Sequence, residues 1–209
     1  MSQSDPNKRL KLLTESLNDS EIKPSRIERL NNIAESLSSV YSEANTLSLN
    51  FICTHNSRRS QLAQVWSHYF SYLYDLKIHS YSSGTEVTKV HPNILNVLEE
   101  AGFEIKKDTR PVDNPIFKLS FSKKGNLIEL FSKSIDDESL PKNYIAITTC
   151  SQADENCPFI PQASMRFSLT YSDPGSYDGS DREMEFYRET NMQIAREIKY
   201  LIKKIKTDE

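Results

Sequence analysis

Residues 47–60 read LSLNFICTHNSRRS, and this stretch decides the fold. Its first part, Leu47–Ile52, is short and apolar and predicts a buried strand. A polar loop begins at Cys53, and apolar residues recur at helical spacing from Arg59 to Tyr74. A loop between a strand and a helix is a place where backbone N–H groups can point together at an anion.

Two side chains give this loop its chemistry. The planar guanidinium of Arg59 can bind two oxygens of a tetrahedral oxyanion. The same positive field favours the thiolate of Cys53, which makes it a nucleophile, and Ser60 can hydrogen-bond the sulfur. The alternative is a buried structural cysteine beside a surface arginine. The residues that we expect to bind the oxyanion are Thr54, His55, Asn56, Ser57, Arg58, Arg59 and Ser60.

The composition narrows the class of protein. The chain has 209 residues, which suits one domain with an extension. A net charge of −3 argues against binding of nucleic acid through phosphate contacts. There is no apolar run long enough to span a membrane and no secretory signal at the start, so we expect a cytoplasmic protein. Three cysteines are too few for a structural disulfide framework.

Strands and helices alternate along the chain. Helices are expected from Ser25, where Ser25 and Glu28 form a capping-box pattern, at Asn93–Ala101 before Gly102, and from Ser180 to Ile205, where Ser180 and Glu183 repeat the pattern. A hairpin is possible between Ile116–Phe121 and Leu127–Phe131. The other predicted strands are Ile78–Ser82, Tyr144–Thr149 and Met165–Thr170.

This alternation predicts an α/β fold in three layers, a central parallel sheet of four strands with helices on both faces. Residues 1–46 are expected to form an N-terminal helical extension, and residues 47–209 the catalytic domain. Ligands bind such sheets at the carboxyl ends of the strands. Cys53, Cys150 and Asp173 each follow a predicted strand, so we expect them at one edge.

Cys150 and Cys157 are seven residues apart. On a continuous helix they would be separated by about 10 Å, whereas a disulfide needs Cα atoms within about 7 Å. A disulfide between them would therefore require residues 151–156 to loop out or unwind. A zinc site lacks the usual close cysteine pairs, and two unrelated free thiols are the remaining alternative.

Asp173 precedes Pro174 in a turn after the Met165–Thr170 strand. Chemistry on a thiolate adduct needs a proton donor for the leaving oxygen, and Asp173 is our candidate. The alternative is a plain Asp-Pro turn. Asp178 and Asp181 are rival acids.

In this order, the loop from Cys53 to Ser60, the pair Cys150 and Cys157, and Asp173-Pro174 resemble the thioredoxin-coupled arsenate reductases of the low-molecular-weight protein tyrosine phosphatase superfamily. The resemblance runs from about Leu47 to the C-terminus. It implies that Cys53 attacks arsenate while Asp173 protonates the departing oxygen. Cys150 would then attack Cys53 and release arsenite, and Cys157 would take over the disulfide, which thioredoxin would reduce.

The sequence departs from this family at three positions. His55 replaces a usual glycine, and Arg58 stands where many members have a further cysteine. Gln64 replaces an acidic residue that helps to bind potassium in some members, so we expect no metal and no cofactor.

Two other functions fit part of these residues. A protein tyrosine phosphatase would use Cys53, Arg59 and Asp173 and would leave Cys150 and Cys157 without a task. A non-enzymatic oxyanion or redox sensor could use the same loop, with the N-terminal helix as a partner surface.

Overall fold

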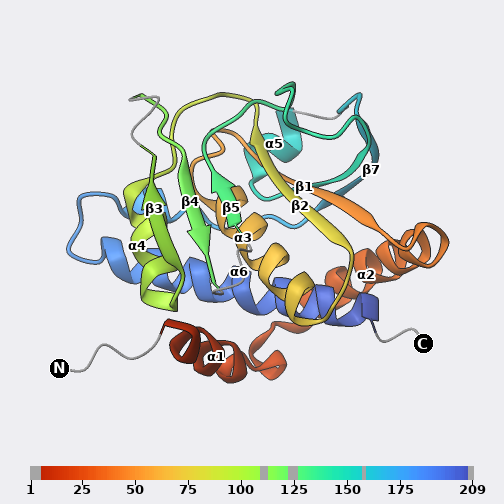
Figure 1. Ribbon diagram of the computed structural model, residues 1–209, viewed down its shortest axis with the longest axis horizontal. Coiled ribbons are helices and arrows are strands. Elements are labelled where there is room, and N and C mark those ends of the chain that lie inside the picture. Colours follow the sequence, from red (N-terminus) through yellow and green to blue (C-terminus); the bar gives the residue numbers. More distant parts are fainter. Residues whose placement is uncertain (1–5, 109–112, 122–126, 157–158, 207–209) are drawn as a thin grey trace.

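The computed structural model describes residues 6–108, 113–121, 127–156 and 159–206. Its centre is a parallel sheet of four strands in the order β2-β1-β6-β7 (Figure 1). This confirms the predicted parallel sheet. The strands are β1 (Leu47–Cys53), β2 (Ile78–Gly84), β6 (Tyr144–Thr148) and β7 (Ala163–Ser168).

The register of the sheet brings the chemistry-bearing residues to one edge. Cys53 pairs with Gly84 of β2, and Ile52 pairs with Thr148 of β6. The chain leaves β6 at Thr149, whose backbone N–H donates to the carbonyl of Ile52 at 2.7 Å. Cys53 and Cys150 are therefore both at the carboxyl ends of neighbouring central strands, as the sequence predicted.

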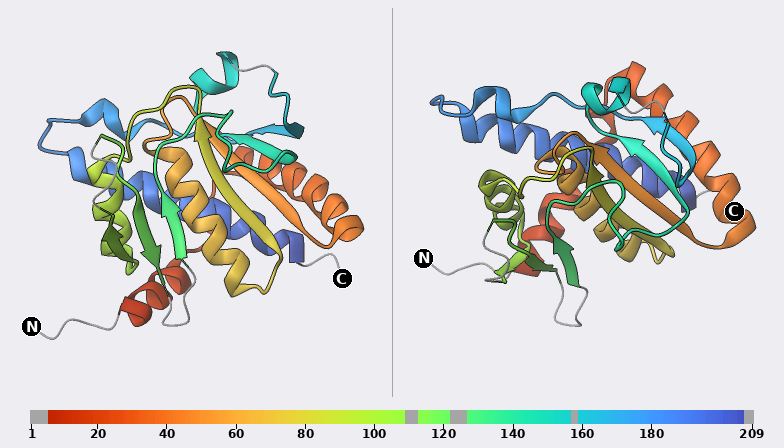
Figure 2. Two further views of the ribbon diagram at one scale, coloured as in Figure 1. Left: turned by 45° about the horizontal axis from the view of Figure 1, so that its top comes forward. Right: turned by 90° about the horizontal axis from the view of Figure 1, so that it is seen from above.

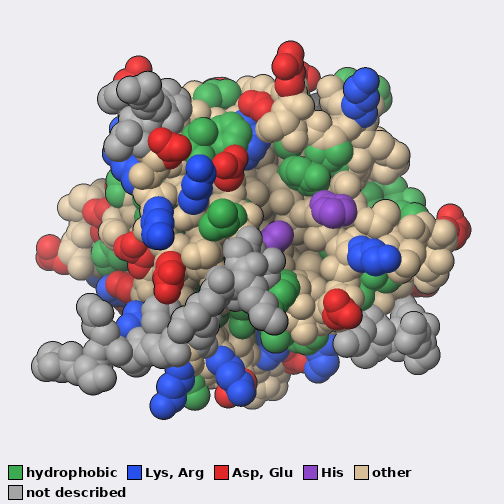
Figure 3. Space-filling view, in the orientation of Figure 1, with side chains coloured by type: hydrophobic (Ala, Val, Ile, Leu, Met, Phe, Trp, Pro, Cys, Tyr) green, Lys and Arg blue, Asp and Glu red, His purple; other side chains and the backbone are tan. Residues whose placement is uncertain are grey.

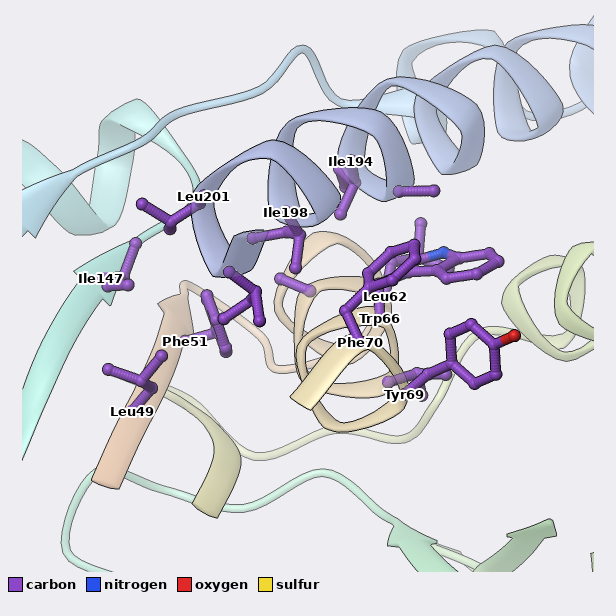
Figure 4. Packing of buried hydrophobic residues seen from close by; sticks show 14 of the residues in the cluster. Leu49, Phe51, Leu62, Trp66, Tyr69, Phe70, Ile147, Ile194, Ile198 and Leu201 are labelled. Atoms are coloured by element: carbon purple, nitrogen blue, oxygen red, sulfur yellow. The ribbon is translucent and has the colours of Figure 1, made fainter. Parts of the chain in front are cut away.

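Helices cover both faces of the sheet unequally. One face packs against three long helices in the main hydrophobic core, while the other packs, among the described residues, against the six-residue α5 (Ser151–Asn156) and against Ile135 and Ile160. Figure 4 shows Leu49 and Phe51 of β1 and Ile147 of β6 on the side of α6, with Trp66 and Phe70 of α3 beside them. The three long helices are α2 (Pro24–Ala44), α3 (Arg59–Leu73) and α6 (Glu183–Lys206).

A second, antiparallel sheet contains the predicted hairpin. It consists of β3 (Glu104–Lys107), β4 (Phe117–Ser120) and β5 (Leu127–Leu130), and it lies beside α4 (Pro92–Ala101) in Figure 1. The turn of the hairpin, residues 122–126, lies outside the described residues. Helix α4 ends at Gly102, whose φ of 111° is the left-handed conformation expected of that glycine.

The N-terminal segment contains one helix that the sequence predicted and two that it did not. Helix α2 buries Leu30, Ile33 and Leu37 in the main core. Before it come α1 (Pro6–Ser16) and the short η1 (Asp19–Glu21). Figure 2 shows α1 at the end of the molecule away from α5, and Leu10 of α1 is buried in the main core as well.

Both predicted capping boxes are wrong. Helix α2 begins with Pro24, which suits the first helical position, and the N-cap is Lys23, whose side chain has no acceptor and makes no capping bond. Helix α6 begins at Glu183, three residues after Ser180. The Ser180 hydroxyl donates to the carbonyl of Tyr177, and the Glu183 carboxylate accepts the N–H of Gly179.

The surface shows no area dominated by one charge in the view of Figure 3, where acidic and basic side chains are interspersed. Among the described residues, no helix is both long and apolar enough to pass through a membrane.

Candidate active site

The loop of residues 54–58, which we call the anion loop, is fixed by its carbonyl groups. All of its carbonyl oxygens accept hydrogen bonds from groups outside the loop. The donors, in order along the loop, belong to Glu86 and Thr85, Thr88 and Ser132, Gln61, His91, and Leu62. The carbonyls therefore face away from the interior of the loop.

The backbone N–H groups of the anion loop have the opposite environment. Within the part of the chain that the structure describes, none of residues 54–58 donates a backbone hydrogen bond. Unpaired N–H groups next to buried residues are rare in proteins unless something binds them. This arrangement is that of a nest for an anion at the N-terminus of α3.

Asn56 sets the shape of the anion loop. Its φ of 45° lies in the left-handed region, which asparagine tolerates better than most residues. Its side chain donates to the Ser60 hydroxyl at 2.8 Å and accepts the N–H of Lys133 at 2.9 Å. Gly84 leaves room for this turn, because a Cβ there would lie 2.6 Å from the carbonyl of Thr54.

Cys53 is buried at the entrance to α3. Its sulfur lies 3.1 Å from the Ser60 hydroxyl, as the sequence predicted. Since Asn56 donates to the same hydroxyl, that group is free to direct its proton to the sulfur. A serine in this place can stabilise a thiolate by a charge-assisted hydrogen bond.

Arg59 is joined to Asp173. Its Nη2 donates to the Asp173 carboxylate at 2.6 Å, and its Nη1 donates to the carbonyl of Tyr171 at 3.0 Å. The Nε–H of Arg59 is buried and has no hydrogen-bond partner among the described residues, so this donor remains available for an anion. Of the three candidate acids, Asp173 is the one that contacts Arg59.

The other two candidate acids lie elsewhere. Asp178 accepts hydrogen bonds from Arg58 at 2.6 Å and from Tyr187 at 2.8 Å. Asp181 is exposed in the turn before α6, which begins at Glu183. Asp173 itself caps the short η2 (Pro174–Tyr177), where its carboxylate accepts the N–H of Gly175 at 3.0 Å. The Asp-Pro turn therefore serves as a turn and presents the carboxyl group at the same time.

Two side chains expected at the oxyanion point elsewhere. His55 pairs with Glu86, 3.2 Å away, and both side chains are about half exposed. The Arg58 guanidinium contacts Tyr187 and Asp178. In both residues the backbone N–H stays in the anion loop, so any contact that they make with an oxyanion is through the backbone.

Cys150 lies in the same small cluster of buried residues as Cys53. Its sulfur is 3.4 Å from the Thr54 hydroxyl and accepts the N–H of Ala153 at 3.3 Å. The structure therefore brings Cys150 to the first residue of the anion loop. Cys157 lies outside the described residues.

Several residues that support the anion loop were missed by the sequence analysis. Ser132 and Lys133, from the segment after β5, reach His55 and Asn56, and Gln61 links the loop to the carbonyl of Phe131 at 2.9 Å. Burial lowers the pKa of Lys133 to about 8, although Asp137 and Glu129 oppose the shift. The only sequence signal for this support was the polar loop itself, because its partners lie far along the chain.

The N-terminal segment also reaches this region. Arg26 of α2 forms an ion pair with Glu197 of α6 and donates to the carbonyl of Thr170 at 3.0 Å. The next residue, Tyr171, supplies the carbonyl that Arg59 binds. Among the described residues, no group of three or more histidine, cysteine or acidic side chains is placed to hold a metal ion.

Comparison with known proteins decides the family. No family model matches the chain. An arsenate reductase of Halalkalibacterium halodurans is 31% identical over 150 residues, which cover 71% of this chain and 90% of that protein. Arsenate reductase 2 of Staphylococcus epidermidis is 30% identical over 157 residues, covering 75% and 94%. This chain belongs to the arsenate reductase family.

The fold agrees with this membership of the arsenate reductase family. A low-molecular-weight protein tyrosine phosphatase from Bacillus subtilis superposes with a TM-score of 0.52 at 15% identity, covering 78% of this chain and 99% of that one. At such low identity the superposition shows the shared fold. The predicted family and fold are thereby confirmed.

Proposed function

We propose that this protein reduces arsenate to arsenite with the thiols of Cys53, Cys150 and Cys157. One observation supports this most: the anion loop keeps its backbone N–H groups and the Nε–H of Arg59 unpartnered beside a buried thiol. Membership of a family whose relatives are named arsenate reductases supports the choice of oxyanion.

The first step uses Cys53, Arg59 and Asp173. The Cys53 thiolate attacks arsenic, a sulfur–arsenic bond forms, and one arsenic–oxygen bond breaks. Asp173 gives its proton to the departing oxygen, which leaves as water. The loop N–H groups and Arg59 stabilise the charge on the remaining oxygens.

The later steps transfer two electrons. The Cys150 thiolate attacks the Cys53 sulfur, a disulfide forms, and the electron pair of the sulfur–arsenic bond stays on arsenic, which leaves as arsenite. Cys157 then attacks Cys150, a new disulfide forms, and the Cys53 thiolate is released. The contact between Cys150 and Thr54 supports the first of these attacks.

A dithiol protein of the thioredoxin type is the proposed reductant. It would reduce the Cys150–Cys157 disulfide and so return both thiols. The cycle needs all three cysteines reduced at its start, which fits the cytoplasm, where glutathione and thioredoxin keep thiols reduced.

The test compares the wild-type protein with Cys150→Ser in two assays. With arsenate and thioredoxin, Cys150→Ser should lose multi-turnover reduction, since arsenite can no longer be displaced. Hydrolysis of an aryl phosphate should survive, because water can attack a phosphocysteine without Cys150. Ser151→Ala is the matched control, as Ser151 is the exposed neighbour of Cys150.

Either of two results would reject the relay. One is multi-turnover arsenate reduction by Cys150→Ser at the wild-type rate. The other is peptide mapping that finds Cys150 and Cys157 both as free thiols after arsenate turnover without reductant. A wild-type protein that hydrolyses aryl phosphates and leaves arsenate unchanged would point to the phosphatase instead.

A further inference from the structure

Arg58 connects three separate segments beside the active site. It belongs to the anion loop, its Nε donates to the Tyr187 hydroxyl of α6 at 2.7 Å, and its Nη2 donates to the Asp178 carboxylate at 2.6 Å. The Tyr187 hydroxyl in turn donates to Asp178 at 2.8 Å. These three residues, which we call the Arg58 cluster, form a closed ring of hydrogen bonds.

The ring has a defined protonation pattern. Burial raises the pKa of Tyr187, so its hydroxyl keeps the proton that it donates to Asp178. His91 stacks on the Tyr187 ring with centroids 5.2 Å apart and an interplanar angle of 18°. Burial and the nearby Arg58 charge lower the pKa of His91, which favours a neutral ring beside the arginine.

The turn that carries Asp173 rests directly on Arg58. A Cβ at Gly175 would lie 2.8 Å from Cζ of Arg58, so the backbone of the turn is in contact with the guanidinium. The Gly175 N–H donates to the Asp173 carboxylate at 3.0 Å, and the Gly175 carbonyl accepts the N–H of Asp178 at 3.2 Å. A shift of Arg58 would therefore shift the group that orients Asp173.

We propose that Arg58 is a positioning residue, which holds the turn of residues 173–178 against the anion loop and thereby fixes the Asp173 carboxyl group for proton transfer. This role rests on the proposed function, in which Asp173 is the acid. The sequence predicted that Arg58 binds the oxyanion. In this proposal the Arg58 side chain positions the acid instead, and the loop N–H groups and Arg59 bind the oxyanion.

The two roles of Arg58 predict different kinetics. If Arg58 positions the acid, Arg58→Ala should lower kcat for phenyl phosphate about 10- to 100-fold, which is less than the roughly 10²- to 10⁴-fold that a general acid contributes, because Asp173 itself remains. The loss should be smaller for an aryl phosphate with a more acidic leaving group, which needs less protonation. Inhibition by inorganic phosphate should change by less than about twofold, since binding of the anion is unaffected.

Matched variants separate the positioning role from a general loss of charge. Asp178→Asn should reproduce the kinetics of Arg58→Ala, and the double variant should be no worse than either, because the groups act as one unit. Arg58→Lys should restore part of the rate. Arg182→Ala is the control, since Arg182 is exposed and pairs with Glu185.

A readout without activity keeps the inference independent of the proposed function. Amide hydrogen exchange at Gly175 and Asp178 should be about tenfold faster in Arg58→Ala and Asp178→Asn, and unchanged in Arg182→Ala. Unchanged exchange in Arg58→Ala would overturn the inference whatever the enzyme reduces or hydrolyses. A large rise in the inhibition constant of phosphate in Arg58→Ala, together with a loss of kcat that does not depend on the leaving group, would also overturn the inference. That result would mean that the Arg58 side chain binds the oxyanion.

Discussion

Cys53 and Cys150 are both buried at the same edge of one sheet, yet the segments that hold them are built differently. Each carbonyl of the anion loop beside Cys53 is bonded to a group outside the loop, including His91 just before α4 and Ser132 after β5. The segment after Cys150 is the six-residue α5, which is attached through Asp154, through the buried Ala153 and through a hydrogen bond from Thr54 to Gln152. The Asp154 carboxylate accepts hydrogen bonds from Thr148 at 2.7 Å and from Arg166 at 2.7 Å.

This difference matches the tasks that we propose for the two thiols. A group that binds an oxyanion gains from a rigid surrounding, because no energy is then lost in arranging the donors during the reaction. In the proposed cycle the Cys150 thiol reacts first with Cys53 and then with Cys157. A segment with fewer hydrogen bonds to the rest of the protein can move more easily between these two partners. The predictions below test whether the two surroundings differ in this way.

The largest effect is expected at Cys53. Cys53→Ser should abolish both arsenate reduction and aryl phosphate hydrolysis, because a serine hydroxyl is a far weaker nucleophile than a thiolate in this site. Steady-state assays of both reactions would measure it. Aryl phosphate hydrolysis at the wild-type rate in Cys53→Ser would place the nucleophile elsewhere.

The next effect is a change of the free energy of unfolding with pH, caused by the buried amine of Lys133. Burial lowers the pKa of Lys133 to about 8. The unfolded chain therefore binds more protons than the folded one between pH 8 and about 10.5, and the stability contributed by this group should rise across that window by about 3 kcal/mol. Urea unfolding at several pH values would measure the rise.

Lys133→Met should remove this dependence on pH and raise the free energy of unfolding at pH 7, where the wild-type amine is buried with its charge. Lys118→Met is the control, because Lys118 is about half exposed. A wild-type free energy of unfolding that does not rise between pH 8 and 10, or a rise that Lys133→Met retains in full, would contradict the prediction.

A smaller effect is expected at Asn56. Asn56→Ala should lower kcat/KM for aryl phosphates about tenfold and the free energy of unfolding by about 2 kcal/mol, since it leaves the buried Lys133 N–H without an acceptor and strains a positive φ. Asn96→Ala, in an exposed position of α4, is the control. If both variants behaved alike, the support of the anion loop would not depend on Asn56.

The smallest effect is expected at Asp154. Asp154→Ala should lower the free energy of unfolding by about 1 kcal/mol, because its partners are partly exposed. It should also speed alkylation of Cys150 by a few-fold while leaving Cys53 unchanged. Mass spectrometry of labelled peptides measures both thiols together, with Glu155→Ala as the exposed neighbour. If alkylation of Cys53 and Cys150 were accelerated equally, the proposed difference between the two segments would be wrong.

The sequence predicted the parallel sheet and the placement of Cys53, Cys150 and Asp173 at one edge of it, because these depend on local patterns and on one rule about strand ends. It missed β3, since the segment Glu104–Lys107 is polar and lies at the edge of its sheet. It also missed α1, whose apolar stripe is narrow in a polar segment.

The capping boxes failed for another reason. A Ser-x-x-Glu pattern is common in polar segments, and a proline or a preceding turn can move the start of a helix by a few residues. The hydrogen-bond partners of the anion loop could not be predicted from local sequence patterns. Ser132 and His91 reach the loop only because the chain folds back over it.

Gly175 has a consequence for related sequences. The space that its missing Cβ would take is filled by the Arg58 guanidinium, so the two positions share one volume. An arginine at position 58 in this conformation favours a glycine at position 175, whereas a small residue at position 58 leaves room for a side chain after the Asp-Pro pair. We expect the two positions to change together during evolution. Sorting homologous chains by this pair should separate those that hold the acid turn with an arginine from those that hold it by other means.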